Sequence, residues 1–293
     1  PKDLVLQCLK SIQGTRDAGH RWYKLISGRF LEIGMTRNTF DHGVFLWDWN
    51  NERSYLVIET DDILMGSTTT GPYHFLQQEL TKLFDFTCRA GNILKFLNLR
   101  IIQSPSGISI DQTQHITSIV LGDYFKGVSP SSIPFKPSPF PIEPAFEREL
   151  YEAAPLVGPS LQAKEKEFGF AFSHIVGGLM HIAGITRIDL SYACMRFSGY
   201  MACPNIPIFA ALHHAMCYLY HHKHLPIMYP RKPLKKSGNI LHTFWKNGQA
   251  EYLSADFGDE LATFTDADYA RCLRSRRSVS SYCILFNGVV VSF

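Results

Sequence analysis

The sequence predicts an α+β fold built on antiparallel sheets. Three observations predict it: β-type runs follow one another across short turns, amphipathic runs at helical spacing lie between them, and 45% of the 293 residues are hydrophobic, which is enough to form buried cores. The formal net charge of +3 neither requires nor excludes a nucleic-acid partner.

The first 125 residues are predicted to form one α+β unit. Apolar residues repeat at helical spacing from Thr15 to Ile33, and the pattern ends at Gly34. Two strands are predicted around the Asn-Asn turn at Asn50, and a third follows Asp62, which gives an antiparallel meander. Further along, the same rules predict these elements: helices over 72–84 and 113–125, and a hairpin of 93–103 with 108–110.

The second half is predicted to begin after a proline-rich segment. Six prolines lie between Ser129 and Pro144, and they predict an extended connector at a domain boundary. Three helical runs are expected near 168–184, 188–202 and 205–222. The chain then returns to β-type segments, ending in a hairpin of 279–286 with 289–293 across Asn287-Gly288. We expect the histidines of the third helical run to lie on a solvated face.

Composition limits the compartment and excludes some classes. The seven cysteines are odd in number and form no CxxC pair, so free thiols in a reducing compartment are expected rather than a disulfide framework or a zinc ribbon. The longest apolar stretch, 168–185, contains His174 and His181, and a buried helix is favoured over a membrane span. Position 1 is Pro1, and no signal segment follows it, so we expect a piece of a longer product.

The pair Asp61-Asp62 is the most informative local feature. It lies between the β-type runs 54–60 and 63–65, so a tight hairpin is predicted whose tip presents two carboxylates side by side. Adjacent like charges repel unless a cation neutralises them, and oxygen ligands of this kind hold Mg²⁺ beside substrate phosphates. The alternative is a solvated turn, because Asp is a common turn residue. The pair alone favours that alternative.

Six motifs, one of which contains this pair, follow one another in the order of a known family. They are Leu9–Ile26 (L-Y-G-L-K-Q-A-x-R-x-W-Y in the family), Asp41-His42 with Phe45 (D-H-x-x-F), Glu59–Asp62 (Y-x-D-D), Lys95–Asn98 (Y-F-L-G), Thr186–Asp189 (T-R-P-D), and Thr265–Ala270 with Arg277–Tyr282 (S-D-A-D-W-A, then K-S-T-S-G-Y). Weak motifs gain force from such a shared order. The chain resembles the reverse transcriptase and RNase H segment of copia-type LTR-retrotransposon polyproteins.

This resemblance implies a domain plan and an activity. It implies a polymerase palm over 1–126, a proline-rich connector over 127–150, a helical thumb or connection over 151–224, and the start of an RNase H-like α/β fold over 225–293. The implied activity is RNA-directed DNA polymerisation with two Mg²⁺ ions. The implied partners are an RNA template, a DNA primer, their RNA/DNA hybrid and deoxynucleoside triphosphates, without a membrane. The implied location is the cytoplasm, in a virus-like particle.

Candidate residues follow from the same resemblance. Asp61 and Asp62 would be catalytic metal ligands of the polymerase, and Asp266 would be the first metal-binding carboxylate of RNase H, whereas Asp268 on the same strand face is better explained as a polar strand end. Gln13 and Gly14 would contact the nucleotide, although Gly14 is equally explained as relaxing the backbone before a helix.

Four other residues are candidates for nucleic-acid contact. Arg16 and Arg21 could bind phosphates, while an ion pair of Arg21 with Asp17 is at least as well supported. Phe96 and Leu97 would hold the primer, although by periodicity alone they are core strand residues. Trp22 and Tyr23 are predicted to pack rather than to stack on bases.

The sequence also departs from the family. The third polymerase carboxylate, carried upstream in the family, and the later RNase H carboxylates are not among these residues, so both sites are expected to be incomplete. Glu59 replaces a Tyr, Asn98 replaces a Gly and Ile188 replaces a Pro. The departures leave two alternatives to a polymerase fragment: a non-catalytic relic that still binds an RNA/DNA hybrid, and an inert fragment.

Overall fold

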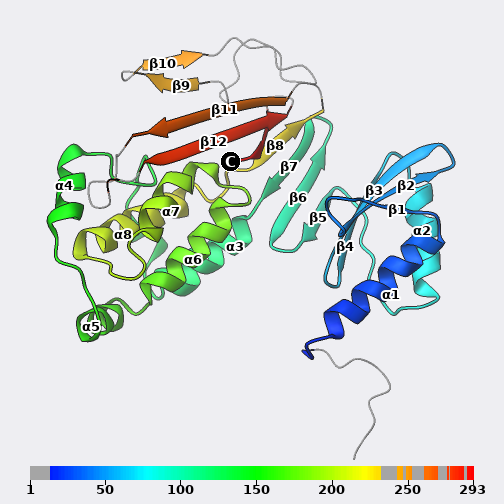
Figure 1. Ribbon diagram of the computed structural model, residues 1–293, viewed down its shortest axis with the longest axis horizontal. Helices are drawn as coiled ribbons and strands as arrows, with labels where there is room; N and C mark the ends of the chain where they lie inside the picture. The colour runs from blue at the N-terminus through cyan, green and yellow to red at the C-terminus, as the bar shows by residue number, and fades with distance from the viewer. Residues whose placement is uncertain are drawn as a thin grey trace, which may run out of the picture. The chain divides into compact units, whose positions relative to one another are not determined.

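A computed structural model describes residues 14–231, 243–246, 249–252, 261–269, 276, 278–286 and 289–293 of the chain. By packing, the chain forms two compact units, Pro1–Gly91 and Asn92–Phe293. Both combine helices with antiparallel sheets (Figure 1), so the predicted α+β class is confirmed. The domain boundary predicted in the proline-rich segment remains a prediction, because a functional domain need not end where a compact unit of the structure ends.

The first unit is built on a four-stranded antiparallel sheet in the order β1-β2-β3-β4. Its strands are β1 (Thr36–Arg37), β2 (Val44–Trp49), β3 (Glu52–Glu59) and β4 (Asp62–Ser67). Asn50 and Asn51 join β2 to β3 with φ of 50° and 64°, values that Asn tolerates better than most residues. The predicted meander is confirmed, and β1 extends it by one strand.

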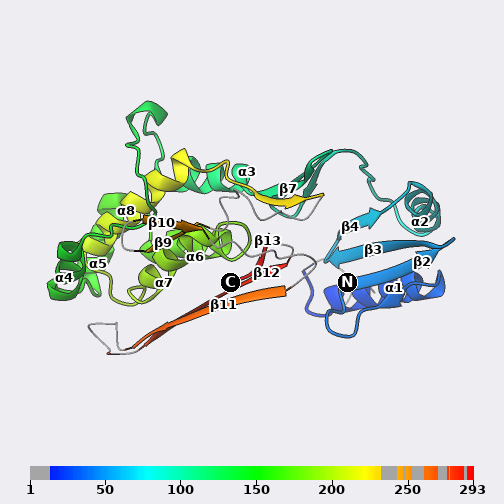
Figure 2. The same cartoon turned by 90° about the horizontal axis from the view of Figure 1, so that it is seen from above.

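Two helices cover one face of this sheet: α1 (Ala18–Glu32), which lies along β2 and β3 in Figure 2, and α2 (Gly71–Thr81). The buried residues of the unit are Ile26, Phe30, Met35, Phe45, Trp47, Leu56, Ile58, Leu76 and Leu80. The strand members of this core share one face by register, because alternate side chains point to the same side. Leu25, one of the apolar residues that repeat at helical spacing in α1, is 58% exposed.

The second unit has its own four-stranded antiparallel sheet in the order β5-β6-β7-β8. Its strands are β5 (Ile93–Phe96), β6 (Leu99–Ser104), β7 (Gly107–Asp111) and β8 (Ile227–Pro230). The run 93–103 is therefore two strands around a turn at Leu97-Asn98, and its prediction as one strand was wrong. Gly107 is required where β7 meets β8, since a Cβ there would lie 2.2 Å from the Tyr229 carbonyl oxygen.

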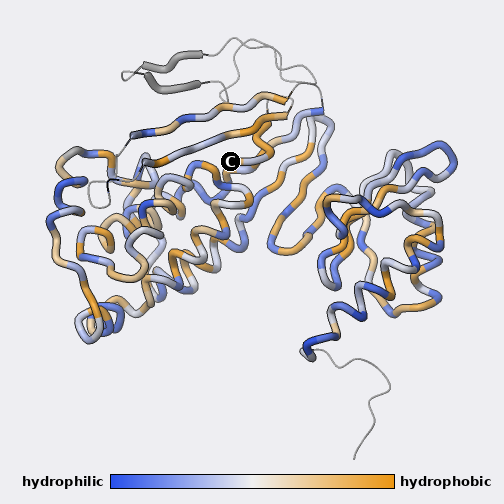
Figure 3. The backbone as a smooth tube through the Cα atoms, in the orientation of Figure 1, coloured by the Kyte–Doolittle hydropathy of each residue, from blue (hydrophilic) through white to orange (hydrophobic). Residues whose placement is uncertain are grey.

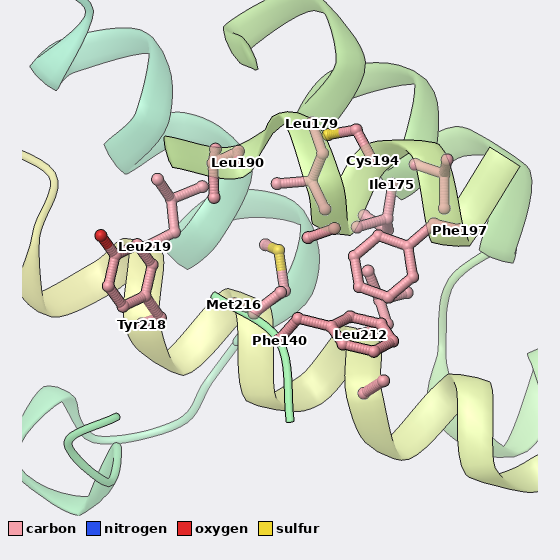
Figure 4. Close-up of a cluster of buried hydrophobic side chains, with 14 of the residues drawn as sticks. Phe140, Ile175, Leu179, Leu190, Cys194, Phe197, Leu212, Met216, Tyr218 and Leu219 are labelled. Carbon is pink, nitrogen blue, oxygen red and sulfur yellow. The ribbon is translucent and has the colours of Figure 1, made fainter. Parts of the chain in front are cut away.

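Helices between β7 and β8 supply the larger core. They are α3 (Thr113–Thr117), which continues as a π-helical stretch over Ser118–Tyr124, then α4 (Pro144–Glu152), α5 (Pro159–Phe168), α6 (Phe172–Ala183), α7 (Ser191–Ser198) and α8 (Ile206–His221). Ile175 and Leu179 of α6, Phe197 of α7, and Leu212 and Met216 of α8 are fully or almost fully buried together (Figure 4). The three predicted helical runs are confirmed, and Figure 3 shows their alternation of apolar and polar residues.

The proline-rich segment belongs to the second unit and packs against its helices. Ile133 and Phe140 belong to the buried core, where Phe140 lies beside Leu212 (Figure 4). Two histidines of α8 bond to its backbone: His221 Nε2 lies 2.8 Å from the Ile133 carbonyl oxygen, and His214 Nε2 lies 2.9 Å from that of Ser138. These histidines are exposed or half-buried, as expected, yet they also fix the segment against the helix.

The chain ends in β-strands: β9 (Thr243–Lys246) with β10 (Gln249–Tyr252), and a three-stranded antiparallel sheet of β11 (Leu261–Asp268), β12 (Val279–Phe286) and β13 (Val289–Ser292). The predicted terminal hairpin is confirmed, although its Asn-Gly turn lies outside the described residues. Among the residues that the structure describes, no helix has the length and apolar character needed to cross a bilayer.

Candidate functional site

The acidic pair lies at the tip of the β3–β4 hairpin. Glu59 pairs with Asp62 across the two strands, which leaves Thr60 and Asp61 as the two-residue turn. Asp61 is thus in the turn itself, and Asp62 is the first residue of β4. Both residues are exposed. Asp62 shares its sheet face with Leu64, opposite to the face covered by the helices, because side chains alternate along a strand.

The turn adopts a backbone conformation that its residues do not favour. Thr60 has φ of 53°, and a β-branched residue in the left-handed region is a genuine outlier. Asp61 has a negative φ, so the turn follows the type II′ pattern, in which Gly usually occupies the first position. Strain of this kind costs about 1–3 kcal/mol and persists only where surrounding contacts impose it.

Helix α1 contacts this turn. The Trp22 indole Nε1 donates a hydrogen bond of 2.6 Å to the carbonyl oxygen of Thr60. The Trp22 ring packs edge-on against Phe84 with ring centroids 5.1 Å apart. Next to it, the Tyr23 hydroxyl donates to the His42 carbonyl oxygen at 2.6 Å. Both aromatic residues therefore pack within the first unit, as the sequence favours.

The motif at Asp41 is structural. Asp41 Oδ1 accepts a hydrogen bond from the Gly43 backbone N–H at 2.8 Å, which closes the loop that leads into β2. The carbonyl of His42 accepts the bond from Tyr23. Phe45 is fully buried and meets Phe30 edge-on. The motif thus connects the start of β2 to α1.

Three carboxylates gather at the hairpin tip, those of Glu59, Asp61 and Asp62. Each is exposed, and none forms an ion pair with a residue that the structure describes. Their oxygen atoms suit Mg²⁺, which is commonly held through one or two carboxylates together with substrate phosphates and water. Within the described ranges, no group of three or more His, Cys, Asp or Glu side chains is arranged to hold a metal by itself. One or two of these carboxylates, completed by water, would suit such an ion.

The residues at the start of α1 are mostly solvent-exposed. Gln13 lies outside the described residues. Gly14 has φ of 89°, a conformation that a side chain would disfavour, and Arg16 is exposed. Arg21 forms the alternative ion pair with Asp17, at 2.7 Å between side chains that are both more than half exposed. Such a pair stabilises a protein by at most about 1 kcal/mol, so it leaves the guanidinium available to a phosphate.

In the second unit, Phe96 and Leu97 lie where β5 turns into β6. Phe96 pairs with Leu99 and is half-buried. Leu97 occupies the turn with φ of 54° and is 52% exposed. Its interpretation as a core strand residue was therefore wrong, since no Gly or Pro signalled the turn. Contact of the pair with a primer remains a prediction.

Asp266 lies on β11 opposite Ser281 and is exposed. Its Oδ1 accepts a hydrogen bond from the Ala267 backbone N–H at 2.9 Å. Asp268 pairs with Val279 and is half-buried. β11 and β5 belong to different sheets of the second unit.

The motif Thr186–Asp189 forms a buried polar node that was not recognised from the sequence. The Arg187 side chain is 1% exposed, and it donates from Nε and Nη2 to the two carboxylate oxygens of Asp189, at 2.8 and 2.6 Å. Its Nη1 donates to the His222 carbonyl oxygen at 2.9 Å, and the Tyr218 hydroxyl donates to Asp189 at 2.7 Å. Burial and the bond to Asp189 raise the pKa of Tyr218 to about 12. Arg187 thus joins the α6–α7 connection to the end of α8.

The geometry defines a class of protein in which the tip of an acidic β-hairpin ends a sheet that has helices on one face. Comparisons with known proteins show what this class resembles. Residues 2–137 match the family model described as "Reverse transcriptase (RNA-dependent DNA polymerase)". This part of the chain, which contains the hairpin, is therefore similar to reverse transcriptase domains.

The relatives are transposon proteins of the copia type. The chain is 24% identical over 86% of its length to the "Retrovirus-related Pol polyprotein from transposon RE1" of Arabidopsis thaliana, and 24% identical over 74% to that of transposon RE2. It is 28% identical over 74% of its length to the putative transposon Ty5-1 protein of Saccharomyces cerevisiae. These matches confirm the resemblance to copia-type transposon polyproteins and their reverse transcriptase. The resemblance of the last part of the chain to RNase H remains a prediction.

The chain spans only part of these relatives. It covers 16% of the RE1 polyprotein, 14% of the RE2 polyprotein and 65% of the Ty5-1 protein. No solved structure matches it.

Proposed function

We propose that the chain is part of a retrotransposon reverse transcriptase and that, within its full polyprotein, it takes part in RNA-directed DNA polymerisation. The observation that carries this proposal is the exposed Asp61-Asp62 pair at the tip of a hairpin within the matched family region. Its partners would be an RNA template, a DNA primer, their hybrid and deoxynucleoside triphosphates. Its location would be the cytoplasm, in a virus-like particle.

The proposal gives roles to the acidic pair of the hairpin and to residues elsewhere that could contact the nucleic acid. Asp61 and Asp62 would hold the metal ions, and Asp62 faces the side of the sheet that the helices leave uncovered. Mg²⁺, when bound, supplies charge stabilisation to the triphosphate and to the primer hydroxyl. Arg16 and Arg21 would bind phosphates, and the exposed Leu97 turn would contact the primer backbone. We do not expect the isolated chain to polymerise DNA, because the carboxylates described here do not complete the metal site.

A second activity is proposed for the terminal sheet. Asp266 on β11 would be the first metal-binding carboxylate of an RNase H site that cuts the RNA strand of the hybrid. Asp266 is exposed on its strand, and its Oδ1 accepts the bond from the Ala267 N–H.

A non-catalytic relic is the second candidate, and Glu59 is the observation that favours it. Glu59 lies directly opposite Asp62, where it adds a third negative charge beside the position proposed for substrate phosphates. Such a relic would bind an RNA/DNA hybrid through its phosphate backbone, and its affinity would fall steeply with salt.

Primer extension by the full-length product tests the proposal. Asp61→Asn should lower Mg²⁺-dependent extension by at least about 100-fold, because loss of a metal ligand removes several kcal/mol of charge stabilisation. Asp48→Asn is the matched control: Asp48 is an exposed carboxylate of the same sheet that bonds to Arg53 at 2.7 Å, and its loss should leave extension unchanged. Undiminished synthesis by the Asp61 variant would refute the metal role, and a wild-type product without extension would favour the relic.

A further inference from the structure

We infer that Trp22 is a positioning residue, whose indole N–H sets the orientation of the Asp61 carboxylate through the peptide bond that joins Thr60 to Asp61. The inference deepens the proposed function and rests on it for the role of Asp61. The juxtaposition itself is a structural observation: Nε1 of Trp22 lies 2.6 Å from the Thr60 carbonyl oxygen.

The Thr60 carbonyl that accepts this hydrogen bond belongs to the central peptide of the turn, and the orientation of that peptide determines the turn type. In a two-residue hairpin, types I′ and II′ differ by a flip of the central peptide, which changes the second residue from negative to positive φ. Here the central peptide is Thr60–Asp61, and Asp61 has a negative φ. A flip would therefore change φ at Asp61 and direct its Cβ, and with it the carboxylate, elsewhere.

The residues of the tip do not hold this state by themselves. Thr60 has a φ of 53°, which Gly occupies at no steric cost and which Thr does not favour. Glu59, Asp61 and Asp62 repel one another, and none of them has an ion-pair partner in the described part of the chain. An outside contact must select the conformation, and the indole N–H is the side-chain donor seen on this peptide.

Trp22 is itself held in place. Its ring packs edge-on against Phe84, and one helical turn further along α1, Ile26 is buried in the core of the unit. The donor is thus fixed to the body of the first unit. A fixed donor orients the carbonyl that it bonds, as outer-sphere partners orient metal ligands, whose loss typically costs 10–100-fold in metal affinity.

Nuclear magnetic resonance of the full chain labelled with ¹⁵N tests the inference with matched variants. Trp22→Phe keeps the aromatic contact with Phe84 and removes the N–H. Tyr23→Phe is the control, because it removes a hydrogen bond of the same length from the neighbouring residue of α1 to a different backbone carbonyl. The readouts are the coupling between the amide and α protons of Asp61, which reports its φ, and the binding of Mn²⁺, followed by paramagnetic broadening near residue 61.

Trp22→Phe should change the Asp61 coupling and weaken Mn²⁺ binding by about tenfold, the lower end of the range for groups that orient a ligand. Tyr23→Phe should change neither. An unchanged coupling in Trp22→Phe would overturn the inference, with or without metal binding. If wild-type chain does not bind Mn²⁺ at the tip, the proposed metal site fails, while the coupling still decides the role of Trp22.

If Trp22→Phe does not fold, exchange of the indole proton in the wild-type chain decides instead. A hydrogen-bonded indole proton should exchange with water much more slowly than a free one. Exchange as fast as that of a free indole would overturn the inference.

Discussion

At the scale of single residues, the structure separates side chains that shape the fold from those left free for chemistry. Asp41 and Phe45 are used by the fold, through a loop bond and a buried ring. Asp61 and Asp62 are exposed at a turn. Thr60, which precedes Asp61, has a strained backbone with φ of 53°, and its side chain is exposed rather than packed in the core. Its position next to Asp61 is the kind of site where backbone strain is retained for function.

Replacing Thr60 with Gly tests this strain. Gly adopts positive φ without steric cost, so Thr60→Gly should raise the free energy of unfolding by up to about 1 kcal/mol, the residual after Gly's larger loss of chain entropy. Chemical denaturation measures it. A loss of stability would mean that the turn is not strained.

At the buried Arg187, a substitution should lower the free energy of unfolding rather than raise it. Arg187→Met leaves the Asp189 carboxylate without its cation, and breaking such a buried pair costs about 3–5 kcal/mol, at the lower end here because Asp189 is 30% exposed. Arg148→Met, at an exposed position of α4, should change stability by less than about 0.5 kcal/mol. Equal effects of the two changes in denaturant titrations would contradict the role given to Arg187.

At the scale of elements, α8 anchors the proline-rich segment through its histidines. Burial lowers the pKa of His214, and the neighbouring Lys136 lowers it further against the opposing effect of the bond to Ser138. Burial and Lys136 also lower the pKa of His213. Neutral imidazoles therefore fit this contact better than charged ones.

The sign of the resulting pH dependence follows from linkage. A histidine whose pKa is lowered by folding contributes stability above its unfolded pKa of about 6.5, and this stability is lost as the pH falls through the folded value. The free energy of unfolding should decrease from pH 7 towards pH 5, and His214→Gln should reduce the slope. An identical slope in the variant, measured by denaturation across this range, would rule out His214 as a source.

At the scale of the whole molecule, local signals predicted the hairpins and most helices. The Asn-Asn turn and the helical spacing before Gly34 are properties of neighbouring residues, and the structure agrees with them. The turn at Leu97 was missed because Leu is not a turn-forming residue and a single Asn beside it is a weaker signal than the Asn-Asn pair. The closure of the second sheet by β8 joins residues more than a hundred positions apart, which spacing rules cannot predict.

The candidate site was predictable only in part, because some of its features are local in the sequence and others join distant residues. The acidic pair is contiguous in the sequence, so its hairpin could be read directly. The bond from Trp22 to Thr60 spans 38 positions, and the opposition of Glu59 to Asp62 depends on the register of the strands. Both needed the structure.

The central claim is that Asp61 and Asp62 hold a divalent metal, and metal-directed cleavage tests it most directly. Fe²⁺ with ascorbate takes the place of Mg²⁺ in many oxygen-ligand sites and cuts the backbone beside the bound ion. We expect a cut close to residue 61, competed by Mg²⁺, abolished in Asp61→Asn with Asp62→Asn and retained in Asp48→Asn. Cleavage elsewhere only, or a cut at residue 61 that persists in the double variant, would contradict the account.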